Sequence, residues 1–315
     1  MRFASFFIKT RKNIVKQKKI CYTKEDFRSK KGQSYMKRSE LIRTPGLCFS
    51  YSRHEHPIVN EYRLHAHEDY ELFYFVSGRG TYSVEGNEYR LSPGCVLLMR
   101  IGETHMMHID PDAPYERFVI NFTAEALSSI DPRGILQEPY LSRPVGQQNL
   151  YMPNQLNQLL VRGCFDAILS AADSEDATQR LAILCNLRTI LYDVQRAFLL
   201  HTKPLSGLPE AQGLIAAVVD YINCNLTETL SLDALSARFF LSKSYLNQQF
   251  RQSTGTTIWD YVLLKRLMLA RTSIRGGASV TEAFHASGFN DYSSFYRRYK
   301  SRFGISPKDD RPRVD

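Results

Sequence analysis

Short β-rich runs alternate with turn residues through the first half of the chain. Apolar and aromatic residues are dense in 70–76, 81–84, 89–91, 96–99 and 117–122, and glycine, proline or asparagine separates these runs. Strands of this length and spacing are typical of an antiparallel sandwich or a small barrel. The pattern therefore predicts a β domain between Leu47 and Phe122.

From Asn154 onward the apolar period becomes that of a helix. Neither of two predicted helices can bury its apolar stripe alone, so we expect both to pack on the β domain or on another subunit. Residues 203–209 contain two prolines and a glycine, which predicts an interdomain linker. The two apolar series are Leu156, Leu159, Leu160, Cys164 and Ile168, and Leu181, Leu184, Leu187, Leu191, Val194 and Phe198.

After Pro209 the pattern predicts only short helices, and their order occurs twice. Shifting the chain by 49 residues places Leu246 and Phe250 on Phe295 and Tyr299, while the helices before them match at a shift of 48. Each unit has a short helix, a tight turn and a second helix with an inward apolar pair. This is the helix-turn-helix pattern, whose second helix fits the DNA major groove. One copy alone would suit ordinary bundle packing, but two copies around a linking helix favour DNA binding.

The net charge of +9 is unevenly distributed along the chain. Residues 1–35 hold 11 basic and 2 acidic residues, residues 36–204 hold 16 and 20, and residues 205–315 hold 14 and 10. Between positions 238 and 302 the count is 11 basic against 3 acidic, which suits a polyanion. Residues 1–35 form either a basic arm that touches DNA phosphates or a disordered extension before a start at Met36.

Several classes of protein are disfavoured by what the sequence lacks. No window approaches eighteen uninterrupted apolar residues, which excludes a membrane-spanning helix. The six cysteines are scattered singly, as expected of reduced thiols in the cytoplasm rather than of a disulfide framework. A Walker loop, a nucleotide-binding glycine fingerprint and a nucleophile elbow are all missing from the sequence, so we do not expect an enzyme.

Residues 210–311 resemble the DNA-binding domain of the AraC/XylS family of bacterial transcription regulators. The matching segments are SLDALSARFFLSKSYLNQQFRQSTG (231–255), IWDYVLLKRLMLAR (258–271) and the run from 288 to 307. The resemblance implies binding to double-stranded DNA, a homodimer formed through helices 154–201, and contact with RNA polymerase if the protein is an activator. Three departures affect the second unit: Phe284, Ser287 and Asp310-Arg311 stand where the family has other residues.

The inward apolar pairs define which side chains of the recognition helices face outward. Asparagine and glutamine suit bidentate contact with adenine, whereas arginine can read guanine or clamp a phosphate. The predicted DNA-binding residues are Ser244, Asn247, Gln248 and Arg251 in the first unit, and Tyr292, Ser293, Tyr296, Arg297, Arg298 and Lys300 in the second.

The β domain contains a group of residues with metal-ligand chemistry. His65, His67 and Glu71 would share one face of a strand, and with His105 they could hold a divalent transition metal. The arrangement resembles the metal positions of the cupin barrel, although the adjacent Pro93-Gly94 lacks the usual intervening residue. Three interpretations stay open: an effector site, a metal site, or histidines with a structural role.

Together these patterns predict a two-domain α+β protein. The expected parts are a basic extension (1–35), a cupin-like antiparallel β-barrel that senses an effector (36–150), a helical dimerisation segment (151–204) and an all-α domain with two helix-turn-helix motifs (205–315). We expect a cytoplasmic transcription regulator that responds to a small molecule, a sugar or a related metabolite. The alternative is a metal-dependent cupin enzyme fused to a DNA-binding module. No cofactor is assigned, and a divalent metal in the cupin-like domain stays open.

Overall fold

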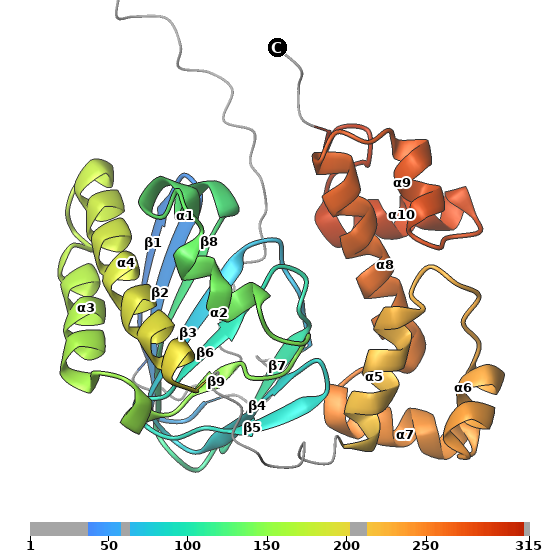
Figure 1. The fold of residues 1–315 in the computed structure, drawn as a ribbon, viewed down its shortest axis with the longest axis horizontal. Coiled ribbons are helices and arrows are strands. Elements are labelled where there is room, and N and C mark those ends of the chain that lie inside the picture. The colour runs from blue at the N-terminus through green and yellow to red at the C-terminus, as the bar shows by residue number, and fades with distance from the viewer. Residues whose placement is uncertain (1–36, 58–63, 202–212, 312–315) are drawn as a thin grey trace, which may run out of the picture.

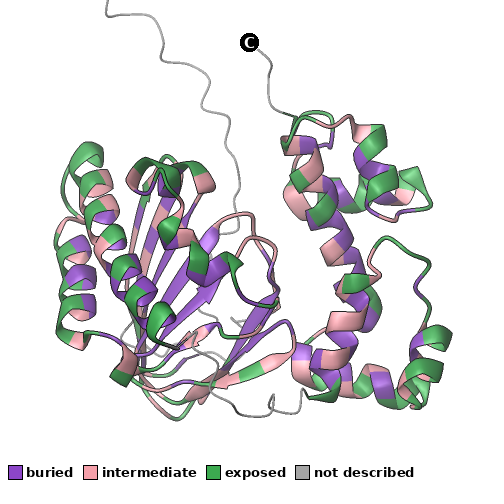
Figure 2. Cartoon of the chain, viewed as in Figure 1, coloured by how far each residue is buried: buried purple, intermediate pink, exposed green. Residues whose placement is uncertain are grey.

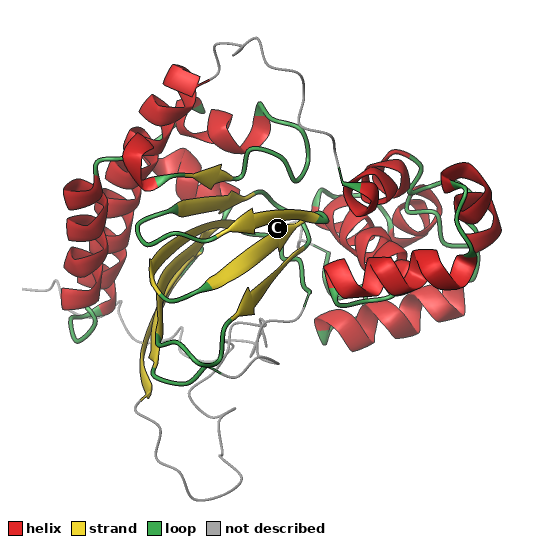
Figure 3. Ribbon diagram, turned by 90° about the horizontal axis from the view of Figure 1, so that it is seen from below, coloured by secondary structure: helices red, strands yellow, loops and turns green. Residues whose placement is uncertain are grey.

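The computed structural model describes residues 37–57, 64–201 and 213–311. A β domain with packed helices lies beside a separate all-helical domain, as Figures 1 and 3 show. The predicted α+β organisation is therefore confirmed. The proposed basic extension and the proposed linker lie outside the described residues.

Nine described strands form two antiparallel sheets. The described part of the chain shows two sheets rather than one closed ring, so the predicted barrel is an open one. The six-stranded sheet has the order β1 (Lys37–Thr44), β2 (Leu47–His54), β8 (Tyr115–Phe122), β3 (Tyr70–Ser77), β6 (Val96–Met99) and β9 (Leu150–Tyr151). The three-stranded sheet has the order β5 (Asn87–Arg90), β4 (Gly80–Val84) and β7 (His105–Ile109).

Strand β3 is buried on both of its faces because its side chains alternate between two cores (Figure 2). Phe73 and Phe75 belong to the core between the two sheets, together with Tyr82. Leu72 and Tyr74 point to the other face and join the core beneath the helices. Each such buried side chain stabilises the fold by about 1.5–3 kcal/mol, so the two cores fix the position of β3 firmly.

The helices of the first domain cover the outer face of the six-stranded sheet. Phe165 and Leu187 are fully buried there, which confirms that the two predicted helices pack on the β domain. Leu159 and Leu181 instead are 89% and 61% exposed, so their assignment to the buried stripes was wrong. The elements are α1 (Ala124–Ile130), η2 (Ile135–Gln137), α2 (Glu138–Leu141), η3 (Pro153–Gln155), α3 (Gln158–Ser170) and α4 (Asp176–His201).

The second domain consists of six helices, and capping side chains set the starts of five of them. Ser231, Ser242, Thr257, Ser279 and Asp291 each accept a hydrogen bond from the backbone N–H three residues later. Such caps stabilise a helix by about 1 kcal/mol each. The helices are α5 (Leu214–Cys224), α6 (Leu232–Phe239), α7 (Lys243–Thr254), α8 (Ile258–Arg275), α9 (Val280–Ala286) and α10 (Tyr292–Phe303).

The helical domain has two small cores, and α8 contributes to both of them. Tyr261 lies in the first core, with α6 and α7, whereas Leu267 lies in the second, with α9 and α10. The predicted repeat is therefore present in three dimensions as two units joined by one helix. No helix in the described ranges is both long and apolar enough to cross a membrane.

Candidate functional site

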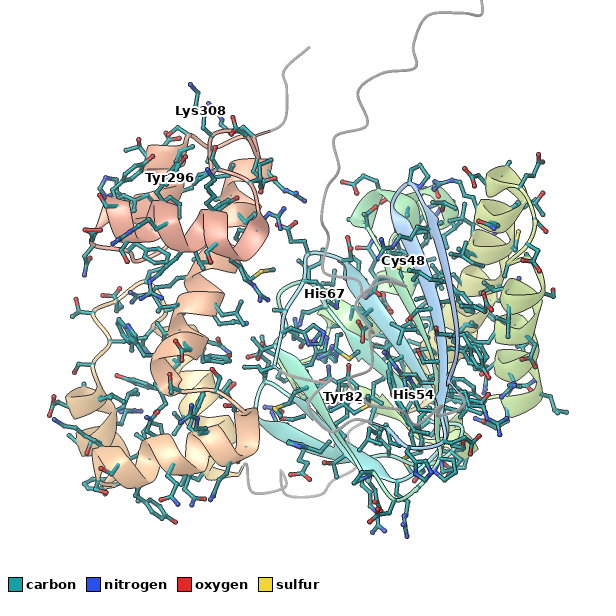
Figure 4. The ribbon with its side chains drawn as sticks, turned by 180° about the vertical axis from the view of Figure 1, so that it is seen from behind. Cys48, His54, His67, Tyr82, Tyr296 and Lys308 are labelled. Atoms are coloured by element: carbon teal, nitrogen blue, oxygen red, sulfur yellow. The ribbon has the colours of Figure 1, made fainter. Side chains whose placement is uncertain are left out.

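The orientation of the recognition helices α7 and α10 agrees with the predicted one. The inward pairs, Leu246 with Phe250 and Phe295 with Tyr299, are fully buried. Nine of the ten predicted contact residues belong to α7 or α10 and are exposed, with Tyr296 labelled in Figure 4. These nine are Ser244, Gln248, Arg251, Tyr292, Ser293, Tyr296, Arg297, Arg298 and Lys300.

Asn247 is the exception on α7. Its side-chain oxygen accepts a hydrogen bond from the backbone N–H of Ile258 at 3.1 Å, at the first residue of α8. Bidentate contact with adenine requires both the oxygen and the nitrogen of the amide. In this arrangement Asn247 joins the recognition helix to the linking helix, and a bidentate contact with adenine would require the hydrogen bond to Ile258 to be released.

The three departures from the family pattern are accommodated in the second unit. Phe284 is buried and contacts Phe295, with ring centroids 5.6 Å apart. The Ser287 hydroxyl is buried and donates to the carbonyl of Phe284 at 3.0 Å. Asp310 accepts hydrogen bonds from Arg271 at 2.6 Å and from the hydroxyl of Tyr299 at 2.9 Å. The core of the second unit is therefore intact, and an ion pair between Arg271 and Asp310 joins the end of the domain to α8.

The second candidate site is the histidine cluster, which we define as His65, His67, His105 and Glu71. One ring nitrogen from each histidine lies within 4.8 Å of the others. The carboxylate of Glu71 lies 2.9 Å from Nε2 of His67 and 3.8 Å from Nε2 of His105. Figure 4 shows His67 on the side of the β domain nearer to the helical domain.

The route by which these residues meet differs from the predicted one. His65 and His67 do not share a strand with Glu71, because β3 begins only at Tyr70. Instead, His65 forms an isolated antiparallel bridge with His105, with N···O distances of 3.0 and 2.9 Å. A bend at residues 68–69 then leads into β3. The predicted residues do converge, but a bridge and a bend position them rather than one strand face.

Hydrogen bonding and burial shift the pKa values of two of the histidines in opposite directions. Nδ1 of His67 lies 2.8 Å from the carbonyl of Asp69 and Nε2 faces Glu71, so both nitrogens donate when the ring is charged. Burial opposes that charge, but the hydrogen bond and the charge of Glu71 outweigh it and raise the pKa of His67. Burial lowers the pKa of His105, which favours its neutral form.

His105 presents an unsatisfied nitrogen to the cluster. Its ring is fully buried. Nδ1 lies 2.9 Å from the carbonyl oxygen of Glu103 and donates a hydrogen bond to it. In the neutral ring, Nε2 then carries a lone pair, and it has no hydrogen-bond partner among the described residues. Buried polar atoms are rarely left unpaired, so this nitrogen marks a place for a ligand atom.

Two residues complete the surroundings of Glu71. Asn121 donates to one carboxylate oxygen at 2.8 Å, and the hydroxyl of Tyr82 donates to the other at 3.1 Å. Burial opposes the negative charge of Glu71, but His105 and His67 outweigh it and hold the pKa of the carboxyl well below its usual range. Asn121 was not predicted as a site residue, because it lies fifty residues from Glu71 in the sequence and meets it only through strand register.

The cluster offers chemistry for two kinds of ligand. Three imidazoles with one carboxylate are a donor set that suits divalent zinc, copper, nickel or iron. The same groups can exchange hydrogen bonds with the hydroxyls of a polar molecule, because the cluster holds both donors and acceptors. The unpaired nitrogen of His105 fits either ligand.

Comparison with known protein families matches both domains. Residues 50–191 match the model of the AraC-like ligand binding domain, and residues 235–313 match that of a helix-turn-helix domain. The HTH-type transcriptional activator RhaS of Pectobacterium carotovorum is 27% identical over 257 residues, which cover 78% of this chain and 85% of that protein. RhaS of Escherichia fergusonii is 26% identical over 256 residues, covering 78% and 86%.

A comparison of structures matches ToxT from Vibrio cholerae at 11% identity and a TM-score of 0.35, covering 84% of this chain and 97% of that one. The two family matches define a class of protein, a transcription regulator with an N-terminal ligand-binding domain and a C-terminal helix-turn-helix domain. The chain belongs to the AraC family.

Proposed function

We propose that this regulator reads DNA through the outward faces of α7 and α10. The observation that carries the proposal is the pair of repeated units with buried inward residues and exposed polar or basic outward residues. With Asn247 engaged by α8, Gln248 is the amide that can contact adenine with both of its polar atoms. Lys300, exposed on α10, supplies charge to a phosphate.

Two substitutions test these separate roles. Gln248→Ala should cost about 1–3 kcal/mol of binding free energy on the cognate site and relax the preference at one base position. Lys300→Ala should weaken binding to all sequences alike and reduce the salt dependence by about one counterion. The measurement is fluorescence anisotropy with the full chain and a promoter fragment taken from a genome-wide binding map. An unchanged affinity and base preference in Gln248→Ala would contradict the assigned helix orientation.

We propose further that the histidine cluster binds the effector. His67 is about one-quarter exposed, so a molecule can reach the cluster from solvent, and Glu71, Tyr82 and Asn121 provide polar groups of mixed character beside it. Hydroxyl groups suit such a set, and the RhaS proteins above, which match most of this chain, are named as transcriptional activators. A carbohydrate or related metabolite is therefore the proposed class of effector.

Metal binding is the second candidate for this cluster, favoured by the spacing of the three imidazole nitrogens. His65, His67 and His105 would hold the ion, which would supply a Lewis acid able to fix a hydroxyl or carboxylate of the effector. Metal analysis of the purified full chain separates the two candidates. Near-stoichiometric metal that is lost in His105→Ala supports the metal site, whereas metal-free protein with a normal effector response supports direct binding.

The remaining partners follow from the proposed role. We propose that this regulator works in the cytoplasm and that it contacts RNA polymerase if it activates transcription. A metal-dependent enzyme is disfavoured, since both domains match regulators and no comparison points to a reaction.

We also propose a homodimer formed through α4. An exposed stripe at helical spacing on this helix consists of Leu181, Cys185, Tyr192 and Leu199. A second copy of the same stripe would cover these apolar side chains.

A further inference from the structure

One short segment of the β domain touches both the histidine cluster and the DNA-binding domain. Residues 64–69 carry two cluster residues, His65 and His67, and enter β3 directly afterwards. Leu64 packs against the core of the first helix-turn-helix unit. The carbonyl of Ala66 accepts a hydrogen bond from Arg302 of α10 at 3.5 Å. The segment is therefore placed between the two functional sites.

The strongest contact of this segment with the helical domain is made by Glu68. One carboxylate oxygen lies 2.6 Å from Nη1 of Arg275, and the other lies 3.3 Å from Nε of Arg271. Both arginines are on α8 and also bind Asp310, which closes the second unit. The side chains of Glu68 and Arg271 are each only 16% exposed, so solvent screens this contact less than it would a surface ion pair.

The backbone of the segment is tied to the cluster at the same time. The carbonyl of His67 accepts from the N–H of Gly102 at 3.0 Å, and His65 is bridged to His105. Glu68 follows His67 directly in the chain, so a ligand that shifts the backbone at His67 would also shift the backbone that carries Glu68. Packed segments of this kind respond by changing between discrete arrangements rather than by bending continuously.

A second polar contact joins the domains at a different point. Glu85, in the β4–β5 turn, accepts from Asn223 at 3.0 Å and from Lys265 at 2.9 Å, and it also bonds the hydroxyl of Tyr261. These partners lie in α5 and in the N-terminal half of α8, on the side of the first unit. Loss of the Glu68 contact would therefore leave the first unit attached, while the second unit would keep the long hydrogen bond from Arg302 to Ala66.

From these contacts we propose that residues 64–69 are an interdomain latch. In the latched state, Glu68 holds Arg271 and Arg275 and restrains the second helix-turn-helix unit against the β domain. Occupation of the histidine cluster displaces His67, weakens the hold of Glu68 and lets the second unit align with DNA. The inference rests on the proposed effector role of the cluster, and it adds the route by which that site changes DNA affinity.

The sharpest test is Arg275→Gln in the full chain, because two explanations predict opposite signs. Simple electrostatics predicts weaker DNA binding, since the variant loses a positive charge. Release of the latch predicts tighter binding, by about fivefold or more, the lower end of allosteric couplings. Glu68→Gln should tighten binding similarly, and Glu88→Gln is its control because it removes the same charge from an exposed position. Binding is measured by anisotropy on a promoter fragment from a genome-wide map.

The route through the segment is tested by combining variants. His67→Ala should tighten DNA binding in the wild-type background but change it by less than about twofold in Glu68→Gln, because the latch is already open. If His67→Ala is poorly folded, His67→Gln takes its place and circular dichroism confirms the fold. Equal effects of the His67 change in both backgrounds would overturn the latch, as would weaker binding by Arg275→Gln.

The same variants distinguish an error in the proposed effector site from an error in the proposed latch. If the cluster is not the effector site, a folded His67 variant keeps the effector response of the wild type in either Glu68 background, and the release of the latch by an effector falls with it. If only the latch is wrong, the His67 change alters the response but does so independently of Glu68. The two failures are therefore distinguishable in the same set of proteins.

Discussion

Phe240 occupies a strained position in the turn of the first helix-turn-helix unit. Its φ angle is 55°, in the left-handed region, and its side chain is 93% exposed. The corresponding turn of the second unit uses Gly288, with φ of 77°. A non-glycine residue in this region costs about 1–2 kcal/mol, whereas glycine loses about 0.5–1 kcal/mol more on ordering the chain. Because the exposed ring contributes no burial, Phe240→Gly should stabilise the first unit by about 0.5–1 kcal/mol.

The single tryptophan of the chain makes this change measurable. Trp259 lies in the first turn of α8, between Ile258 and Tyr261 of the first core, so its fluorescence reports unfolding of that unit. With a urea slope of about 1–2 kcal/mol per molar, the midpoint should rise by about 0.5 M with an unchanged slope. Phe240→Ala is the control, since it removes the ring but keeps the Cβ atom. A glycine variant no more stable than the alanine variant would refute the strain argument.

Other predictions concern the β domain and the dimer. Glu103→Gln should destabilise the β domain by about 3–5 kcal/mol, because it leaves the fully buried Arg143 guanidinium without its carboxylate; near-UV circular dichroism under urea measures this. Burial opposes ionisation of Glu103, but Arg143 outweighs it and lowers the pKa to about 2. This stabilisation is therefore complete above the ordinary pKa near 4.5 and is lost as the pH falls toward 2, which acid titration of the same signal checks. Leu181→Glu combined with Tyr192→Glu should yield monomers by light scattering, and dimers that persist would move the interface elsewhere.

The sequence predicts those features of the fold that depend on a few neighbouring residues, such as a buried strand or the start of a helix. The strand 96–99 and the starts of the DNA-binding helices were placed as observed, because apolar runs and capping side chains act within a few residues. Strand β1 (37–44) was missed, since its sequence KRSELIRT is largely polar and gains its order from pairing with β2. The short helices between 124 and 141 were missed because, at seven, three and four residues, they are too short to show a helical period.

In the candidate sites, too, the residues could be predicted from the sequence, whereas their contacts with distant parts of the chain could not. His65, His67, Glu71 and His105 were predicted as a group, but the bridge that joins them depends on contacts between distant strands. The partnership of Asn247 with α8 could not be foreseen, because it depends on how two helices of one unit cross. The role of Glu68 was equally hidden, since its partners lie over two hundred residues away in the other domain.

We propose that the histidine cluster controls the affinity of the two recognition helices for DNA. The most direct measurement is a titration of sugars and related metabolites into the full chain bound to its mapped promoter fragment, with His67→Ala measured in parallel. We expect at least one compound to change the DNA affinity of the wild type by about fivefold or more and to have no effect on a folded His67→Ala protein. An equal response of both proteins to that compound would contradict it.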